Sequence, residues 1–142
     1  FTSSRSRDHW YMNRQMTAIL RKVPLAMAMG TIFFLSHQPG DSLTLSLLPG
    51  SDKLAHMLAY GVLAGTVLFA FCEQQKNWKI LRVMLFTVAF CFFYGLSDEF
   101  HQSFIPGRTA SVYDLVADCA GAAMACALWA KWRKRAAMIR CL

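Results

Sequence analysis

Residues 83–94 decide the fold, and they read Val83-Met-Leu-Phe-Thr-Val-Ala-Phe-Cys-Phe-Phe-Tyr94. An α-helix with this sequence presents apolar side chains in nearly every direction and has no polar stripe. A helix that packs in a soluble bundle needs such a stripe, because one of its faces meets water. The stretch therefore predicts a helix surrounded by lipid, over roughly Leu81–Leu96 and continuing to about Gln102.

Three more stretches are similarly hydrophobic, roughly Met16–Leu35, Leu54–Phe71 and Tyr113–Trp132. Apolar residues make up 56% of the chain and charged residues 16%, whereas about a quarter of the residues in soluble globular proteins are charged. Crossing a bilayer takes about 17–25 helical residues. The sequence therefore predicts an all-α integral membrane protein, a bundle of four transmembrane helices that run alternately up and down.

The first of the four stretches is the least regular, because Arg21 and Lys22 interrupt it. Their long side chains can reach a membrane interface, which leaves Val23–Leu35 as the apolar core. A cleaved signal peptide is the alternative, but no small-residue cleavage pattern follows Leu35, so we interpret the stretch as a retained helix. With 142 residues, the chain is predicted to be one domain with a basic leader (about 1–15) and a basic tail (about 133–142).

The basic residues predict the orientation of the bundle. Of the 15 Lys and Arg residues, all but Lys53 and Arg108 fall before residue 23, between residues 76 and 82, or from residue 131 onward. Segments rich in Lys and Arg stay in the cytoplasm, so both termini and the middle loop are expected there. The net charge of +7 then reflects topology and contact with anionic lipids, and nucleic acid is not an expected partner.

Side chains able to do chemistry gather at the outward ends of the predicted helices. Charges at membrane depth are costly, so they usually serve a function or pair with one another. Spacings of four residues put members of each set on one helix face, and three helices are predicted to converge on one outward-opening polar pocket. The residues are Asp52, Lys53, His56 and Tyr60 in the second helix, Asp98, Glu99, His101 and Gln102 in the third, Arg108 in the following loop, and Asp114 and Asp118 in the fourth. Small residues that would let the helices approach closely are Gly61, Gly65, Gly95 and Gly121.

Three uses of such a pocket remain open. Its histidine and carboxylate side chains could ligate zinc or another divalent ion, although no spacing matches a recognised metal signature. A carboxylate or histidine could instead act as acid or base on a lipid head group, with Lys53 and Arg108 holding phosphate. The third use is structural: Lys53 and Arg108 would neutralise the carboxylates in an ion-paired network that fixes helix packing. Outside the pocket, His37 is interpreted as a turn residue, and Tyr94 and Tyr113 as interfacial aromatic residues.

Four blocks of sequence resemble the VanZ-like family of small integral membrane proteins, and the resemblance covers nearly everything from Phe34 to Trp129. The blocks are Ser36-His-Gln-Pro-Gly40, Asp52-Lys53-Leu-Ala-His56-Met-Leu-Ala-Tyr60-Gly-Val-Leu-Ala64, Asp98-Glu99-Phe-His-Gln102-Ser-Phe-Ile-Pro-Gly-Arg108 and Asp114-Leu-Val-Ala-Asp118-Cys-Ala-Gly121. The family commonly has Asn where this chain has Asp118, a change that adds a carboxylate to the pocket. The resemblance implies a four-helix protein of the bacterial cytoplasmic membrane that acts on the cell envelope and lowers susceptibility to teicoplanin-type glycopeptides. It does not supply a reaction.

Residues and resemblance together predict a protein that binds, and in an enzymatic version modifies, an anionic lipid or a lipid-linked envelope precursor. A divalent metal is the cofactor that the polar residues would hold. The alternatives are a non-enzymatic protein that binds or shields an envelope target, and a partner-binding protein whose charged cluster fixes helix packing. The catalytic candidates are His56, Asp98, Glu99, Asp114 and Asp118, and the substrate-binding candidates are Asp52, Lys53, Tyr60, Gln102 and Arg108.

Overall fold

The computed structural model describes residues 15–39, 51–75 and 77–139, with side chains as far as residue 136. Most of the predicted leader, the loop at 40–50 and the last three residues lie outside the described residues. A helical stretch at residues 15–20 precedes the named helices. These are α2 (Val23–Ser36), α3 (Ser51–Ala70), α4 (Cys72–Gln75), α5 (Ile80–Gln102) and α6 (Val112–Ile139).

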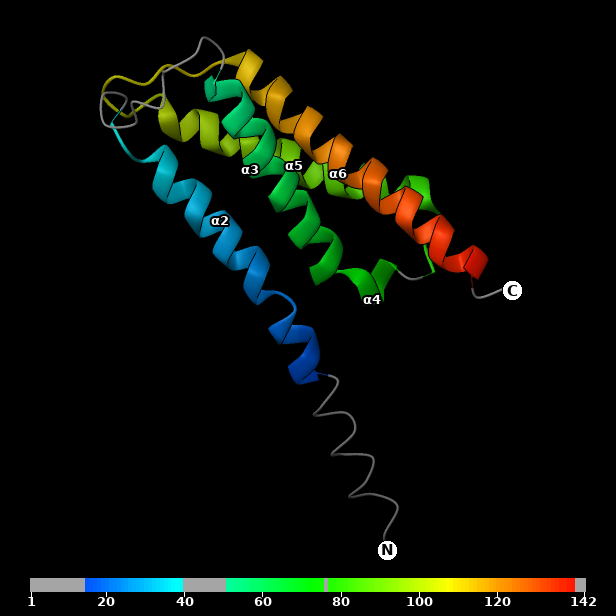
Figure 1. The fold of residues 1–142 in the computed structure, drawn as a ribbon. Coiled ribbons are helices and arrows are strands. Elements are labelled where there is room, and N and C mark those ends of the chain that lie inside the picture. The colour runs from blue at the N-terminus through cyan, green and yellow to red at the C-terminus, as the bar shows by residue number, and fades with distance from the viewer. Residues whose placement is uncertain (1–14, 40–50, 76, 140–142) are drawn as a thin grey trace, which may run out of the picture.

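Four helical segments are long and apolar enough to cross a membrane, namely Gln15–Ser36, Ser51–Ala70, Ile80–Gln102 and Val112–Ala136. They confirm the predicted all-α fold with four transmembrane helices. Consecutive segments run in opposite directions, so α2 and α5 finish at the end of the bundle where α3 and α6 begin (Figure 1). The short helix α4 lies at the other end, between α3 and α5.

Two features of the helices differ from the prediction. α6 continues past Trp132 to Ile139, because Ala, Lys and Arg favour helix and neither Gly nor Pro interrupts them. The first span contains a turn at Arg21 and Lys22, just before Pro24, since proline starts a helix more readily than it continues one.

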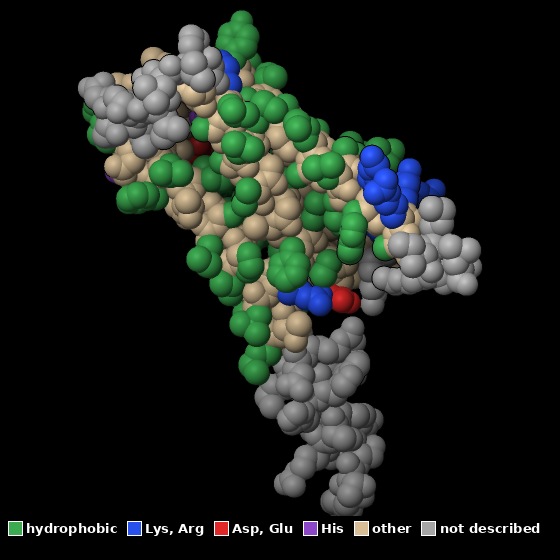
Figure 2. All heavy atoms as spheres, viewed as in Figure 1, with side chains coloured by type: hydrophobic (Ala, Val, Ile, Leu, Met, Phe, Trp, Pro, Cys, Tyr) green, Lys and Arg blue, Asp and Glu red, His purple; other side chains and the backbone are tan. Residues whose placement is uncertain are grey.

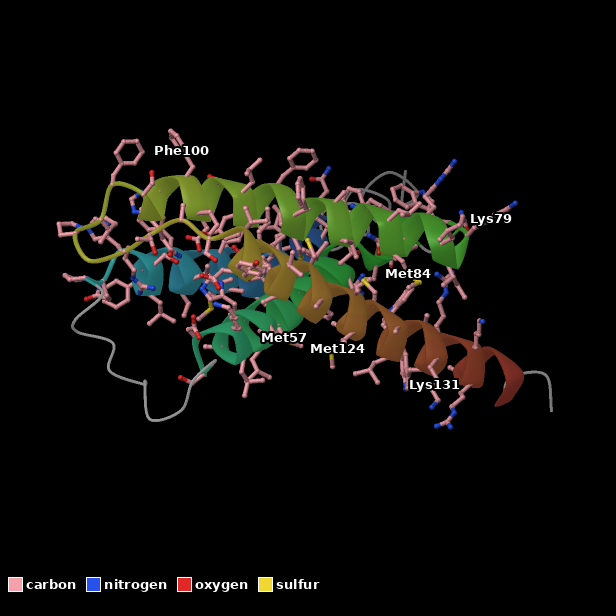
Figure 3. All side chains as sticks on the ribbon, turned by 90° about the horizontal axis from the view of Figure 1, so that it is seen from above. Met57, Lys79, Met84, Phe100, Met124 and Lys131 are labelled. Atoms are coloured by element: carbon pink, nitrogen blue, oxygen red, sulfur yellow. The ribbon has the colours of Figure 1, made fainter. Side chains whose placement is uncertain are left out.

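The outer surface of the bundle is apolar, as contact with lipid requires. Leu81, Phe93 and Leu128 are 66%, 66% and 68% exposed, and hydrophobic side chains are spread over the face seen in Figure 2. The same figure shows Lys and Arg gathered where α6 ends. In Figure 3, Lys79 and Lys131 lie toward that end and Phe100 lies toward the other. The bundle therefore has a basic end opposite the end where α5 finishes.

Small residues let the helices pack closely. A Cβ added at Gly121 of α6 would overlap the carbonyl oxygen of Met57 on α3, and one at Gly61 would lie 3.5 Å from the Gly121 carbonyl oxygen. A Cβ at Gly95 of α5 would meet side chains of α6 at 2.9 and 3.0 Å. These three glycines have the predicted role. Gly65 does not, because nothing lies within 4 Å of the position of its missing Cβ.

Tyr94 is placed differently from the prediction. Its hydroxyl donates a hydrogen bond of 2.6 Å to the carbonyl oxygen of Met29, so it joins α5 to α2 inside the bundle instead of anchoring the chain at an interface. Tyr113 is 74% exposed and can fill the predicted interfacial role.

Candidate functional site

The end of the bundle where α2 and α5 finish and α3 and α6 begin is its polar end (Figure 1). The predicted site residues come to this end, but they do not form a single cluster. Most of them belong to two named groups or to an ion-paired set around Lys53. The inner carboxylate group consists of His56 on α3, Glu99 on α5 and Asp118 on α6. The α2–α5 group consists of Ser36, Asp98 and Gln102.

The inner carboxylate group brings three helices together. Nδ1 of His56 lies 2.9 Å from Oδ1 of Asp118, and the Asp118 side chain is fully buried while that of His56 is 16% exposed. Glu99 reaches the group from α5, and one potential ligand atom from each of the three residues lies within 4.8 Å of the others. Helix packing has therefore concentrated two carboxylates and an imidazole in one small volume.

Three buried polar atoms in this region have no hydrogen-bond partner among the described residues: Oε1 of Glu99, Oδ2 of Asp118 and the hydroxyl of Tyr60. The other Glu99 oxygen, Oε2, accepts a 2.7 Å hydrogen bond from the backbone N–H of Ser111. That bond fixes the Glu99 carboxylate of α5 against Ser111, the residue that precedes α6. Buried polar atoms are nearly always satisfied, so three that are not mark a place where a ligand would complete the contacts.

The Lys53 ammonium forms ion pairs with two carboxylates. Its ammonium lies 2.9 Å from Oδ1 of Asp114 and 3.0 Å from Oδ2 of Asp52. The Asp114 side chain is mostly buried, whereas that of Asp52 is largely exposed. Lys53 therefore fits the predicted packing network better than the predicted role of holding phosphate.

The α2–α5 group is built around Asp98. Its Oδ2 accepts hydrogen bonds from the Ser36 hydroxyl at 2.8 Å and from Nε2 of Gln102 at 3.1 Å, and Gln102 also donates to Ser36 Oγ at 3.2 Å. All three side chains are buried. Ser36 was missed as a site residue, although it begins the Ser-His-Gln-Pro-Gly block that the sequence singled out.

Two histidines lie beside this group. Nδ1 of His37 is 3.2 Å from Nε2 of His101, and the two rings stack with centroids 5.4 Å apart. Phe33 stacks on His101 with a centroid separation of 4.8 Å. His37 thus has a specific partner on α5, which its interpretation as a turn residue did not include.

A cavity of about 270 Å³ lies between α2 and α5 at the polar end. Its polar lining side chains include Asp98 and His101, while Phe100 and Phe104 in the same lining are 68% and 69% exposed. The pocket therefore combines polar side chains with exposed aromatic rings. Its lining residues are Phe33, Tyr94, Ser97, Asp98, Phe100, His101 and Phe104.

Arg108 contacts backbone instead of the carboxylates that the sequence suggested for it. Its Nε donates to the Gln38 carbonyl oxygen at 3.2 Å and its Nη2 to the Leu35 carbonyl oxygen at 3.3 Å. These contacts use two of the five N–H donors of the guanidinium. The loop after α5 is thereby attached to the end of α2, and Arg108 retains donors for an anion.

The ring of Tyr60 lies beside the inner carboxylate group and beside the cavity lining. The ring centroid lies 6.5 Å from that of His56 and 6.3 Å from that of Tyr94, and Tyr94 lines the cavity. Tyr60 is 1% exposed. The Tyr60 ring is therefore a neighbour both of His56 in the inner carboxylate group and of Tyr94 in the cavity lining.

Carboxylates outnumber permanent cations at this end. Among the described residues its acidic side chains are Asp52, Asp98, Glu99, Asp114 and Asp118, and its Lys and Arg side chains are Lys53 and Arg108. Negative charge without compensation is costly at membrane depth. No Lys or Arg among the described residues forms an ion pair with Glu99 or Asp118, so the inner carboxylate group needs protons or a bound cation.

Comparison with known proteins places this architecture in a family. The family model described as VanZ/LLP1 matches residues 3–133. An uncharacterized protein of Schizosaccharomyces pombe is 30% identical over 88 residues, which cover 62% of this chain and 52% of that protein. The chain thus spans about half the length of this curated relative. No solved structure gives a significant match. With nearly the whole chain matched, this four-helix membrane protein belongs to the VanZ/LLP1 family.

Proposed function

We propose that this protein binds the anionic head group of a membrane lipid or lipid-linked molecule in the cavity between α2 and α5. The observation that carries the proposal is the composition of that cavity, which has Asp98, His101 and exposed aromatic rings in its lining. A lipid offers the matching combination, a polar head joined to an apolar chain. In a bilayer, the rings of Phe100 and Phe104 lie where acyl chains would contact them.

Arg108 does not line the cavity, but it lies at the same end of the bundle, and we assign it the positive charge that an anionic head group requires. It lies where the loop after α5 meets the end of α2, and the N–H donors not used by the two carbonyl oxygens are suited to phosphate. Lys53 is not part of this site, since two carboxylates occupy its ammonium. The proposed head group therefore interacts with Arg108 for its charge, and with Asp98 and His101 for its hydroxyl or amine groups.

The direct test is native mass spectrometry of the detergent-purified protein beside two variants of α5. Ser97 lines the cavity, and a tryptophan there fills it. Ala89 lies two turns earlier on the same helix and is exposed, so Ala89→Trp is the matched control. We expect a retained phospholipid or lipid-linked phosphate in the wild type and in Ala89→Trp, and at least about tenfold less in Ser97→Trp. Equal retention in both variants, or no retained mass in the wild type, contradicts the proposal.

The family membership supports a role in the cell envelope, and the proposed location is the bacterial cytoplasmic membrane with the polar end outward. The cellular readout is susceptibility to teicoplanin. Expression of the wild type in a sensitive strain is expected to raise the inhibitory concentration, and Ser97→Trp is expected to abolish that increase while Ala89→Trp preserves it. An unchanged inhibitory concentration for the wild type would remove antibiotic resistance from the proposal and leave lipid binding to the direct test.

A reaction on the bound head group is the second candidate, and the contact between His56 and Asp118 favours it. A carboxylate that bonds one nitrogen of a histidine orients the ring for proton transfer through the other. In that case His56→Ala and Glu99→Gln abolish turnover of the lipid while the protein still inserts and still retains it. Saturable binding without turnover in the wild type would favour the binding function alone.

A further inference from the structure

We propose that the inner carboxylate group, His56, Glu99 and Asp118, binds a divalent cation, with Zn²⁺ as the ion best suited to its mixed nitrogen and oxygen donors. The three residues come from three helices, and their potential ligand atoms lie within 4.8 Å of one another. Imidazole nitrogen and carboxylate oxygen are ordinary zinc ligands. Metal binding at this site can be measured without lipid. Its result therefore tests the metal site independently of the proposed lipid binding.

The distance between His56 and Asp118 is close to that of two ligands of one ion. Nδ1 and Oδ1 are 2.9 Å apart, and tetrahedral ligand bonds of about 2.0–2.2 Å place neighbouring donor atoms about 3.3–3.6 Å apart, so small side-chain shifts make room for the ion. An ion can therefore take the place of the proton that lies between these two atoms in the metal-free protein. Glu99 offers the third ligand atom, which lies within 4.8 Å of the other two.

Burial provides the second observation. Glu99 is 6% exposed and Asp118 is 0% exposed, and each has a buried oxygen with no hydrogen-bond partner among the described residues. Asp98 is equally buried, at 5%, yet its Oδ2 receives two hydrogen bonds and neither of its oxygens is a buried atom without a partner. Burying a carboxylate oxygen without a partner is costly, and a cation removes that cost. The contrast separates a carboxylate that is satisfied within the protein from two that are not.

The surroundings hold the proposed ligands in position. The Ser111 N–H donates to Oε2 of Glu99, so Oε1 is the oxygen available to a ligand. Hydrogen bonds of this kind fix ligand orientation and contribute to metal affinity. Three protein ligands also leave a coordination position open, as in catalytic zinc sites. The unpartnered hydroxyl of Tyr60 belongs to a ring that stacks beside His56, on the side toward the cavity.

The test measures metal content and affinity in the full chain. Detergent-purified protein is stripped with a chelator and titrated with Zn²⁺, and the bound metal is quantified by inductively coupled plasma mass spectrometry. Two pairs of variants are matched by side-chain chemistry and burial: Glu99→Gln with Asp98→Asn, and His56→Ala with His101→Ala. We expect one equivalent in the wild type and both controls, and at least about tenfold weaker binding in Glu99→Gln and His56→Ala.

A spectroscopic signal from a further variant distinguishes the loss of a metal ligand from misfolding of the protein. His56→Cys replaces one zinc ligand by another, so it is expected to keep the site and, with Co²⁺ as the probe, to show a thiolate-to-metal charge-transfer band in the near ultraviolet. Wild-type protein that binds less than about a tenth of an equivalent overturns the proposal. So does an equal loss in His101→Ala, which would assign the metal to the His37–His101 pair, or a His56→Cys variant that binds Co²⁺ without this band.

Discussion

Nδ1 of His56 lies 2.9 Å from Oδ1 of Asp118, which is fully buried, so an imidazole in the second turn of α3 meets a carboxylate in the second turn of α6. The two helices that this contact joins are also the pair that pack most extensively among the described elements. A polar contact has therefore been placed where the backbones approach most closely. The stability of the bundle and the chemistry of the inner carboxylate group consequently depend on the same packing.

Removing His56 is expected to destabilise the protein, because a buried carboxylate then loses its partner. We expect His56→Ala to lower the free energy of unfolding by about 3 kcal/mol, measured by denaturation in mild detergent. The double variant with Asp118→Ala should recover part of this loss, with a coupling energy of about 1–3 kcal/mol. Asp52→Ala is the control, since that carboxylate is largely exposed. Additive effects of His56→Ala and Asp118→Ala would show that the contact contributes nothing.

Lys53, and not Arg108, is the predicted partner of Asp114 in a double-mutant cycle. The Lys53 ammonium lies 2.9 Å from Asp114, whereas Arg108 contacts backbone carbonyl oxygens. Lys53→Ala and Asp114→Ala should therefore be non-additive, and Arg108→Ala with Asp114→Ala should be additive within about 0.5 kcal/mol. The measurement is the same detergent unfolding. Coupling between Arg108 and Asp114 would contradict the observed contacts and restore Arg108 to the ion-paired network that the sequence suggested.

Gly121→Ala is expected to disrupt the packing of α3 on α6. The added methyl group would overlap the carbonyl oxygen of Met57, and a clash with backbone is relieved only by moving a helix. We expect a loss of about 1–3 kcal/mol, with Gly65→Ala as the matched control because nothing lies within 4 Å of its Cβ position. If both variants unfold at the wild-type denaturant concentration, the close approach at Gly121 is wrong.

Tyr94→Phe should weaken the attachment of α2 to α5. The variant removes the hydroxyl that donates to the carbonyl oxygen of Met29 at 2.6 Å and keeps the ring. The expected loss is about 1 kcal/mol. Tyr113→Phe removes a hydroxyl from a side chain that is 74% exposed and should leave stability unchanged. A larger effect at Tyr113 than at Tyr94 would favour the interfacial role that the sequence suggested for both.

The orientation of the bundle can be tested by cysteine labelling in intact cells. In a background without the five natural cysteines, Thr109→Cys reports the polar end and Asn77→Cys the opposite loop. Both positions are exposed. The positive-inside rule predicts that a membrane-impermeant maleimide labels Thr109→Cys directly and Asn77→Cys only after permeabilisation. The reverse pattern would place the polar end in the cytoplasm.

Much of the fold could be predicted from local sequence. Long apolar runs without a polar face specify membrane helices whatever their neighbours are, because each helix satisfies its own backbone hydrogen bonds. The end of α5 at Gln102 followed from its polar last turn and the Pro106-Gly107 turn, where Gly107 has a φ of 76°. The extension of α6 beyond Trp132 was missed because a basic sequence was interpreted as a tail although its residues favour helix.

The sequence by itself determined that the carboxylates and histidines would meet at one end of a four-helix bundle, because alternating helices bring their positions to the same level. Only the tertiary structure decided which of them meet. Asp98 and Glu99 are neighbours in sequence, but successive residues point about 100° apart around a helix. Asp98 therefore bonds to Ser36 of α2, and Glu99 to the Ser111 N–H before α6. The packing of α5 against both partners thus separates a satisfied carboxylate from one that is left for a ligand.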